Sequence, residues 1–389
     1  MTLRLSTLAH LPSSNIPLVV NIFKLFNGTN IISVRFSKKF LPLSLSFKTI
    51  LPLLFALFTT VIRVCATLNW LARNWMITQP PIPNWKYVLV GYTGFLHGVI
   101  TIGLLHIERV RKEIVTLLNA CVDTELQLIL EGGPGYVHRY FVTLSAIVAS
   151  SFVLVPCAVS VMSFFQPCMP PVITSTMILN CKNCSHSGAV GLAMKLVLGI
   201  YEFYTGIVVI GSVGIGVYIV LLYPIEVKLF ILDYIERKEM QTKPQARGYH
   251  LYKYRVLQLI STYHDNTWCQ PSVPVTLGGI SVAETVSLYV LVTSHDRFPI
   301  IILLMFLMVA LDCFVVIHSV CKIVAKPYSK SCNFIEFMKI RNLSKWVKYF
   351  MRSCRPSKFS MGDGTFFDRL TSFVLWQKCI DLLITLLLM

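Results

Sequence analysis

The sequence predicts an all-α membrane protein that crosses the bilayer seven times. Hydrophobic residues make up 55% of the 389-residue chain and charged residues only 14%, whereas soluble domains carry about 25% charged residues. The mean hydropathy is +0.66, and several apolar runs exceed the ~18 residues from which a transmembrane helix is expected. We therefore assign the net charge of +17 to membrane-flanking loops rather than to nucleic-acid binding.

Seven apolar segments are long enough to cross a bilayer as helices. They cover residues of about 49–72, 87–107, 140–165, 195–223, 273–294, 300–321 and 371–389. The chain then divides into an N-terminal segment at 1–48, spans one to four at 49–223, an inner segment at 224–272, spans five and six at 273–321, a basic inner segment at 322–370, and the last span at 371–389.

The basic residues predict the orientation of these spans, because Lys and Arg are enriched in cytoplasmic connections. With the N-terminus inside, the four inner segments hold six, four, seven and eleven of the 35 basic residues, and the outer connections hold only five. The other two lie within spans. We therefore expect a cytoplasmic N-terminus, an extracellular C-terminus and a multi-pass protein of the plasma membrane.

The outer connection between spans three and four has the features of an extracellular loop. Asn183 begins an Asn-X-Ser sequon on the predicted outer side and is a candidate glycosylation site. Cys168, Cys181 and Cys184 lie in the same loop, where an oxidising exterior allows a disulfide. A zinc site that adds His186 is the alternative, but it lacks a second spaced ligand pair, so we expect neither a metal nor another cofactor.

Three stretches on the predicted inner side combine charges with apolar residues at three- and four-residue spacing, which is typical of amphipathic helices. They lie at about 225–240, 249–266 and 334–353. Two arrangements are open for them. They are either basic amphipathic helices on the inner leaflet or helices that pack together as a cytoplasmic domain and oligomer interface.

Ionisable residues inside spans are functional candidates, because a charge is costly in hydrocarbon. Arg63, Glu202, Glu284 and Asp312 lie inside predicted spans. An ion pair of Arg63 with Glu284 or Asp312 would simply hold helices together. We expect His97, in span two, to be an interior histidine with its hydrogen bonds satisfied rather than a metal ligand.

The last span carries a polar stripe. At about 100° per residue, Gln377, Lys378, Asp381 and Thr385 fall on one side of the helix, while Leu, Ile, Val and aromatic residues occupy the rest. One polar face and one apolar face suit a pore-lining helix, and a ring of Asp381 carboxylates in a symmetric oligomer would favour cations. The alternative is an intrahelical pair of Lys378 with Asp381 that faces a neighbouring helix.

The segment before this span joins a basic motif to a turn of small residues and two phenylalanines. The residues are Arg352, Ser353, Arg355 and Pro356, followed by Gly362, Gly364, Phe366 and Phe367. This pattern resembles the C-terminal segment of the insect-type seven-transmembrane chemoreceptor superfamily, the odorant and gustatory receptors. The length, the long inner segments and a chain that ends with span seven also resemble that superfamily. The Thr-Tyr and Gln-Phe pairs of gustatory receptors are missing from the last helix, so the chain is identified as a divergent member.

The resemblance implies a chemosensory receptor that is a ligand-gated, non-selective cation channel and not an enzyme. It implies a homo- or hetero-tetramer, with or without a co-receptor subunit, in which each last helix lines a shared pore. A small organic odorant or tastant would bind in the outer half of each helical bundle. Aromatic residues at such spacing more often serve core packing. With that alternative open, the candidate pocket residues are Tyr92, Phe95, His97, Phe152, Tyr201, Phe203 and Tyr204.

Two other classes of membrane protein remain as alternatives. A G-protein-coupled-type receptor needs the N-terminus outside, which would place most basic residues on the outer side. A small-solute transporter would work without a shared central pore. The stretch "GSVGIG" at 211–216 in span four serves either movement during gating or close helix packing.

Overall fold

The computed structural model describes residues 14–27, 33–37, 39–42, 47–76, 83–133, 137–165, 167, 172–173, 191–241, 251–268, 271–293, 300–340, 345–361 and 364–388. Within these ranges the elements are α1 (Ile16–Phe26), β1 (Val34–Phe36), β2 (Phe40–Pro42), α2 (Phe47–Met76), α3 (Asn84–Arg109), α4 (Arg111–Leu130), α5 (Arg139–Phe165), α6 (Leu192–Gly214), η4 (Ile215–Leu222), α7 (Tyr223–Gln241), α8 (Tyr252–Thr267), α9 (Ser272–Thr293), α10 (Ile300–Val315), η7 (Val316–Val320), α11 (Cys321–Ile340), α12 (Lys345–Ser353) and α13 (Thr371–Leu388). The predicted glycosylation site and outer cysteines, at Asn183, Cys168, Cys181 and Cys184, lie outside the described residues.

Seven helices in the described ranges are long and apolar enough to cross a bilayer, which confirms the predicted fold class. They are α2, α3, α5, a continuous helix over 192–240, α9, a continuous helix over 302–340, and α13. Each contains one predicted span. The chain is therefore a multi-pass membrane protein, while the orientation of its termini stays a prediction.

The helices that contain spans four and six continue beyond the residues at which the hydropathy falls. α6 continues through the π-helical segment η4 into α7, and α10 continues through η7 into α11. No glycine lies between Gly216 and Gly248, so the first continuation lacks the residue that most often ends a helix. Hydropathy indicates where a helix leaves the hydrocarbon, whereas the helix itself ends only where its backbone hydrogen bonding stops. The predicted span ends at about 223 and 321 therefore lie inside continuous helices.

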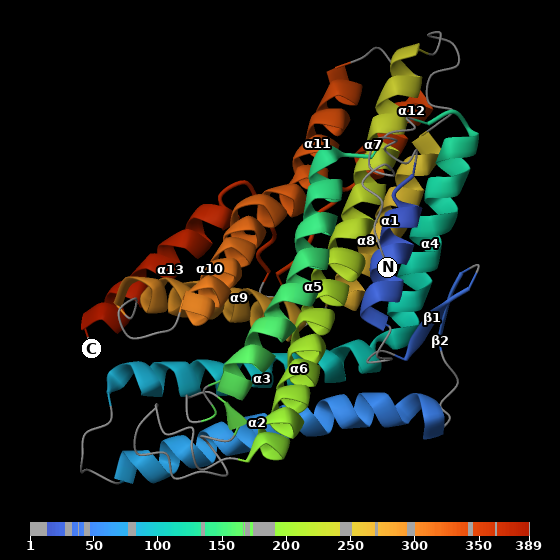
Figure 1. Ribbon diagram of the computed structural model, residues 1–389. Coiled ribbons are helices and arrows are strands. Elements are labelled where there is room, and N and C mark those ends of the chain that lie inside the picture. The colour runs from blue at the N-terminus through green and yellow to red at the C-terminus, as the bar shows by residue number, and fades with distance from the viewer. Residues whose placement is uncertain are drawn as a thin grey trace.

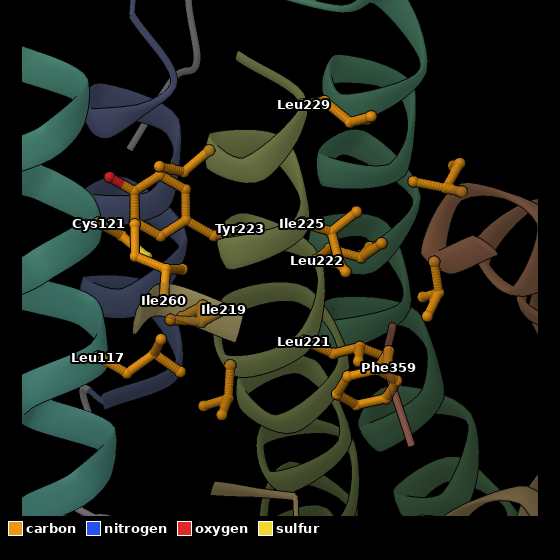
Figure 2. Packing of buried hydrophobic residues seen from close by; sticks show 14 of the residues in the cluster. Leu117, Cys121, Ile219, Leu221, Leu222, Tyr223, Ile225, Leu229, Ile260 and Phe359 are labelled. Carbon is orange, nitrogen blue, oxygen red and sulfur yellow. The ribbon is translucent and has the colours of Figure 1, made fainter. Parts of the chain in front are cut away.

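The extensions of these helices form a bundle with α4 and α8. In Figure 1, α4, α7, α8, α11 and α12 gather in the upper part of the view, α9 and α13 lie at the left, and α2 and α3 cross the lower part. α7 is central, because it packs against α4, α8 and α11. Figure 2 shows Cys121 of α4 beside Tyr223, and Leu117 of α4 and Ile260 of α8 close to Ile219. Of the two arrangements left open for the inner helices, packing within the chain is the one observed.

Hydropathy did not predict α4, because its apolar residues form a stripe rather than a continuous run. The stripe recurs at helical spacing and includes Ile114, Leu117, Leu118, Cys121 and Val122. α4 also supports the N-terminal part of the chain. Its Glu125 carboxylate accepts hydrogen bonds from the backbone N–H of Asn15 at 2.6 Å and from Ser14 Oγ at 2.8 Å, which satisfies a donor at the start of α1.

The short antiparallel hairpin of β1 and β2 pairs Val34 with Pro42 and Phe36 with Phe40. It is fixed to α4 by one amide side chain. Asn119 donates from Nδ2 to the Phe40 carbonyl and accepts from the Phe40 N–H, both at 2.8 Å. The Asn119 side chain thus satisfies the backbone N–H and C=O of Phe40, as a neighbouring strand would.

The glycine-rich stretch of span four provides close packing at Gly214. A Cβ built on Gly214 would lie 2.5 Å from Cε2 of Phe26 on α1. Phe26 is fully buried and meets Phe152 of α5 edge to face at 4.9 Å. Glycine at this position therefore lets α1 lie directly against the fourth span.

Candidate functional site

A mostly apolar cavity of about 110 Å³ lies among α2, α3, α5, α6 and α10. Its walls are aliphatic, methionine and phenylalanine side chains, and a few polar groups from α2, α3 and α6 converge on it. The polar lining residues are Arg63, Tyr92, Thr93, His97, Glu202 and Thr205. An apolar cavity with few convergent polar groups is the usual form of a small-molecule site.

The strongest polar feature of the cavity is a buried ion pair between Arg63 of α2 and Glu202 of α6. Neither side chain is more than 3% exposed. The Glu202 carboxylate also accepts a hydrogen bond from the backbone N–H of Ile173 at 3.1 Å. The predicted partners of Arg63, Glu284 and Asp312, are wrong, because hydropathy cannot tell which acidic residue lies opposite Arg63 in the bundle.

The hydrogen bond of His97 Nδ1 determines whether the other ring nitrogen, Nε2, is a donor or an acceptor toward the cavity. Nδ1 lies 2.8 Å from the Thr93 carbonyl oxygen, and only a protonated Nδ1 can donate to that acceptor. In the neutral ring Nε2 is therefore a hydrogen-bond acceptor. The prediction of a satisfied interior histidine holds for Nδ1. The hydroxyl of Tyr92, one turn away on α3, makes no hydrogen bond to the described part of the chain.

A second, larger cavity of about 240 Å³ adjoins the first. Five residues line both, namely Tyr92, Leu96, Val155, Val209 and Val309. Both π-helical segments contribute to the second cavity, through Val217 of η4 and Val316 of η7. Asp312 also lines it and accepts a hydrogen bond from Ser151 Oγ at 2.6 Å.

A third small cavity extends this apolar path toward the last helix. It shares five lining residues with the second cavity, among them Val217, Trp268 and Val316, and its lining includes Phe359 and Phe367. These two phenylalanines belong to the segment that directly precedes α13. The interior cavities thus run from the Arg63–Glu202 pair to the start of the last helix.

Two of the seven predicted pocket residues line the first cavity, and both lie on α3: Tyr92 and His97. The other five lie outside its lining. Phe95 and Phe203 are exposed on the outer surface of their helices, and Phe152 packs on Phe26. The Tyr201 ring lies 5.6 Å from the guanidinium carbon of Arg63, and Tyr204 packs on Phe55. Aromatic content alone therefore does not show which side of a helix faces the cavity.

Sequence reasoning also missed the small and aliphatic lining residues, because valine, leucine and threonine are common on every face of a span. Thr205 and Gly206 lie one turn after Glu202 on α6. A signal was available at this position. A charged residue within a span faces the bundle interior, so Glu202 indicates which face of α6 lines the cavity.

α13 packs through one face and leaves the other uncovered in the single chain. Leu375 and Cys379 are buried, and the Cys379 carbonyl accepts a hydrogen bond from Thr285 Oγ1 of α9 at 3.4 Å. The predicted polar stripe is exposed at all four positions, Gln377, Lys378, Asp381 and Thr385. No ion pair joins Lys378 to Asp381 within the described residues. The remaining intramembrane acid, Glu284, is buried on α9, the helix that supports α13.

Seven spans around an interior cavity, with a last helix that presents a polar face outward, define a multi-pass membrane protein. The chain is similar to the structure of the insect olfactory receptor OR5 from Machilis hrabei in complex with eugenol. The TM-score is 0.65 at 10% sequence identity, over 96% of this chain and 98% of that chain. A second structure of the same receptor matches with a TM-score of 0.62 over the same shares. This likeness confirms the predicted insect odorant receptor-like fold.

No protein-family model matches the sequence, and no curated protein matches it. The identity to OR5 is only 10%, so the likeness is one of fold.

Proposed function

We propose that this chain is a subunit of a chemosensory cation channel in the plasma membrane, gated by a small organic odorant or tastant. Four subunits surround one pore, and α13 of each lines it. The observation that carries the proposal is the exposed polar face of α13, whose opposite face packs on α9. Polar and charged groups are costly against lipid, and a water-filled pore between subunits removes that cost.

The cavity supports a specific chemistry for the ligand. Its walls favour a largely apolar molecule, and its size favours a small one. His97 Nε2 offers an acceptor in the neutral ring, and the Tyr92 hydroxyl can donate or accept. We therefore expect a ligand with one hydroxyl or carbonyl group at one end of an apolar body. The Arg63–Glu202 pair is already matched, so it orders the wall without requiring a charged ligand.

Gating requires that the ligand bind the open arrangement better than the closed one. The chain of cavities supports a physical route for this effect, because it connects the ligand cavity to Phe359 and Phe367 before α13. Two π-helical segments border the route. Such segments are frequent at functional sites.

The proposal is tested by whole-cell recording from cells that express the chain, alone and with an insect co-receptor subunit, while small odorants and tastants are applied. Asp381→Asn is expected to change the relative permeability of cations. Glu284→Gln is the control, because Glu284 is buried on the packed side. A ligand-evoked current with the same permeability in all variants would remove Asp381 from the conduction path. Absence of any evoked current from chain present at the cell surface would contradict the channel.

The ligand site is tested separately in the same cells. Tyr92→Phe removes only a hydroxyl and is expected to raise the half-maximal ligand concentration about tenfold, the effect of one lost hydrogen bond. Tyr204→Phe is the matched control outside the cavity. Equal shifts in both variants would contradict this cavity as the ligand site.

A further inference from the structure

A basic groove of about 680 Å³ lies where α11, α7 and α5 meet the start of α13. It is distinct from the three interior cavities and shares no lining residue with them. Its charged and titratable lining residues are Lys322, Lys326, Lys330, Arg369, His138, Tyr140 and Asp233. Three lysines and one arginine therefore face a single carboxylate.

The lysines occupy one face of α11 because they are spaced four residues apart. Lys330 forms an ion pair with Asp233 of α7, which accounts for the one carboxylate of the lining. Within the described residues, Lys322, Lys326 and Arg369 form no ion pair with a carboxylate. These three cations are therefore available to an anion from outside the chain.

The groove wall holds one of these cations in position. The Lys326 ammonium lies 4.9 Å from the centre of the Tyr140 ring, at the range of a cation–π contact. Tyr140 in turn donates a hydrogen bond to Glu226, and His138 Nδ1 lies 2.8 Å from the same carboxylate. Glu226 is buried behind both rings, so it orients the wall without lining the groove.

The position of the groove along its helix points to the membrane surface. Leu307, Leu311 and Phe314 are exposed on the apolar part of the helix, and the exposed side then becomes basic at Lys322 and Lys326. A change from apolar to basic on one exposed stripe marks the level of the lipid headgroups. On the predicted orientation this is the cytoplasmic leaflet.

The start of α13 shows the same change over a few residues. Arg369 lines the groove, and Phe373, one turn later, is 64% exposed. The rings of Phe314 and Trp376 lie 5.5 Å apart, so the exposed apolar surfaces of α10 and α13 are adjacent. A molecule with phosphates in the groove would have apolar surface for its chains directly beside it.

We propose that this groove binds the phosphorylated headgroup of an anionic phospholipid. Its phosphate oxygens accept hydrogen bonds from Lys322, Lys326 and Arg369, and its acyl chains lie along Phe314 and Phe373. Because Arg369 precedes α13 and the lysines belong to α11, the bound lipid joins the start of the last helix to the sixth span. Lysine and arginine clusters next to membrane helices are typical of such recognition.

The experiment uses the purified full-length protein and measures binding of dioctanoyl phosphatidylinositol 4,5-bisphosphate by thermophoresis. The triple variant Lys322→Gln/Lys326→Gln/Arg369→Gln is expected to bind about a hundredfold more weakly, since each basic residue at an anionic surface contributes about fivefold. Lys345→Gln/Lys348→Gln/Arg352→Gln is the matched control. It removes the same charge from α12, where all three residues are exposed, and should bind like wild type.

Two further arms identify the ligand and check folding. Inositol 1,4,5-trisphosphate, which lacks acyl chains, is expected to bind at least tenfold more weakly than the lipid. Lys322→Arg/Lys326→Arg keeps the charge and should retain binding. Equal loss in both triple variants would show non-specific attraction and overturn the proposal. If the soluble inositol phosphate binds as tightly as the lipid and its binding also depends on the groove residues, the groove recognises a free phosphate compound, and the proposal of a lipid ligand is overturned.

Discussion

Breaking the Arg63–Glu202 pair tests whether the interior of this bundle depends on a matched charge. Both side chains are at most 3% exposed, so neither charge can reach water when its partner is lost. Removing one partner of a buried ion pair costs about 3–5 kcal/mol, because the other charge remains buried and uncompensated. Glu202→Gln and Arg63→Met should each destabilise the protein by this amount.

The double variant Arg63→Met/Glu202→Gln separates the pair from its surroundings. The side-chain amide oxygen introduced by Glu202→Gln can still accept the hydrogen bond that the Ile173 N–H donates to Glu202, and no unmatched charge remains. We therefore expect the double variant to be more stable than either single variant, with a coupling energy of several kcal/mol. Effects of substitutions at independent sites add to within about 0.5 kcal/mol, so such a coupling would be well above that limit.

The assay is thermal unfolding of purified protein in detergent, followed by the loss of the monodisperse peak in size-exclusion chromatography. With about 2 °C per kcal/mol for a large chain, each single variant should lose about 6–10 °C. Glu284→Gln is the control, since Glu284 is equally buried and its Oε2 has no hydrogen-bond partner among the described residues. Additive losses in the double variant, or an equal loss in Glu284→Gln, would refute the reasoning.

Two further predictions concern the N-terminal helix. Gly214→Ala places a methyl group 2.5 Å from Phe26 and should lower the free energy of unfolding by about 1–3 kcal/mol because it overpacks the contact. In thermal unfolding, the added substitution Phe26→Leu should restore part of the lost stability. A double variant no more stable than Gly214→Ala would contradict this explanation. Burial raises the pKa of Glu125 above 4.5, so the folded state binds this proton more tightly and loses stability as the pH rises above about 4.5. Glu125→Gln should flatten that fall above about pH 4.5, and an unchanged slope would contradict it.

Part of the candidate site was predictable because each signal was local. The polar stripe of α13 follows from helical spacing alone, and the structure leaves all four of its residues exposed. Tyr92 and His97 were predicted as aromatic residues of a span, and both line the first cavity. Phe95 and Phe203 have the same aromatic character but lie on the outer surface, and nothing in their own segments distinguishes them.

Other features depend on pairs of residues distant in the sequence. Glu202 lies 139 residues after Arg63, and Glu125 meets Asn15 across 110 residues. Composition shows that such charges need partners, but several acidic residues satisfy that need equally well. The choice is made by which helix faces are brought together, and this is a property of the packed bundle.

The sequence by itself determined the number of spans and their places, because crossing a bilayer requires long uninterrupted apolar helices. It also determined the two faces of the last helix, because side-chain direction repeats with the helical period. Only the tertiary structure decided which acid pairs with Arg63, which residues line the cavities, and that Lys322, Lys326 and Arg369 share one groove. These depend on how helices distant in sequence pack against one another, and packing is decided by the shapes and charges of all their faces together.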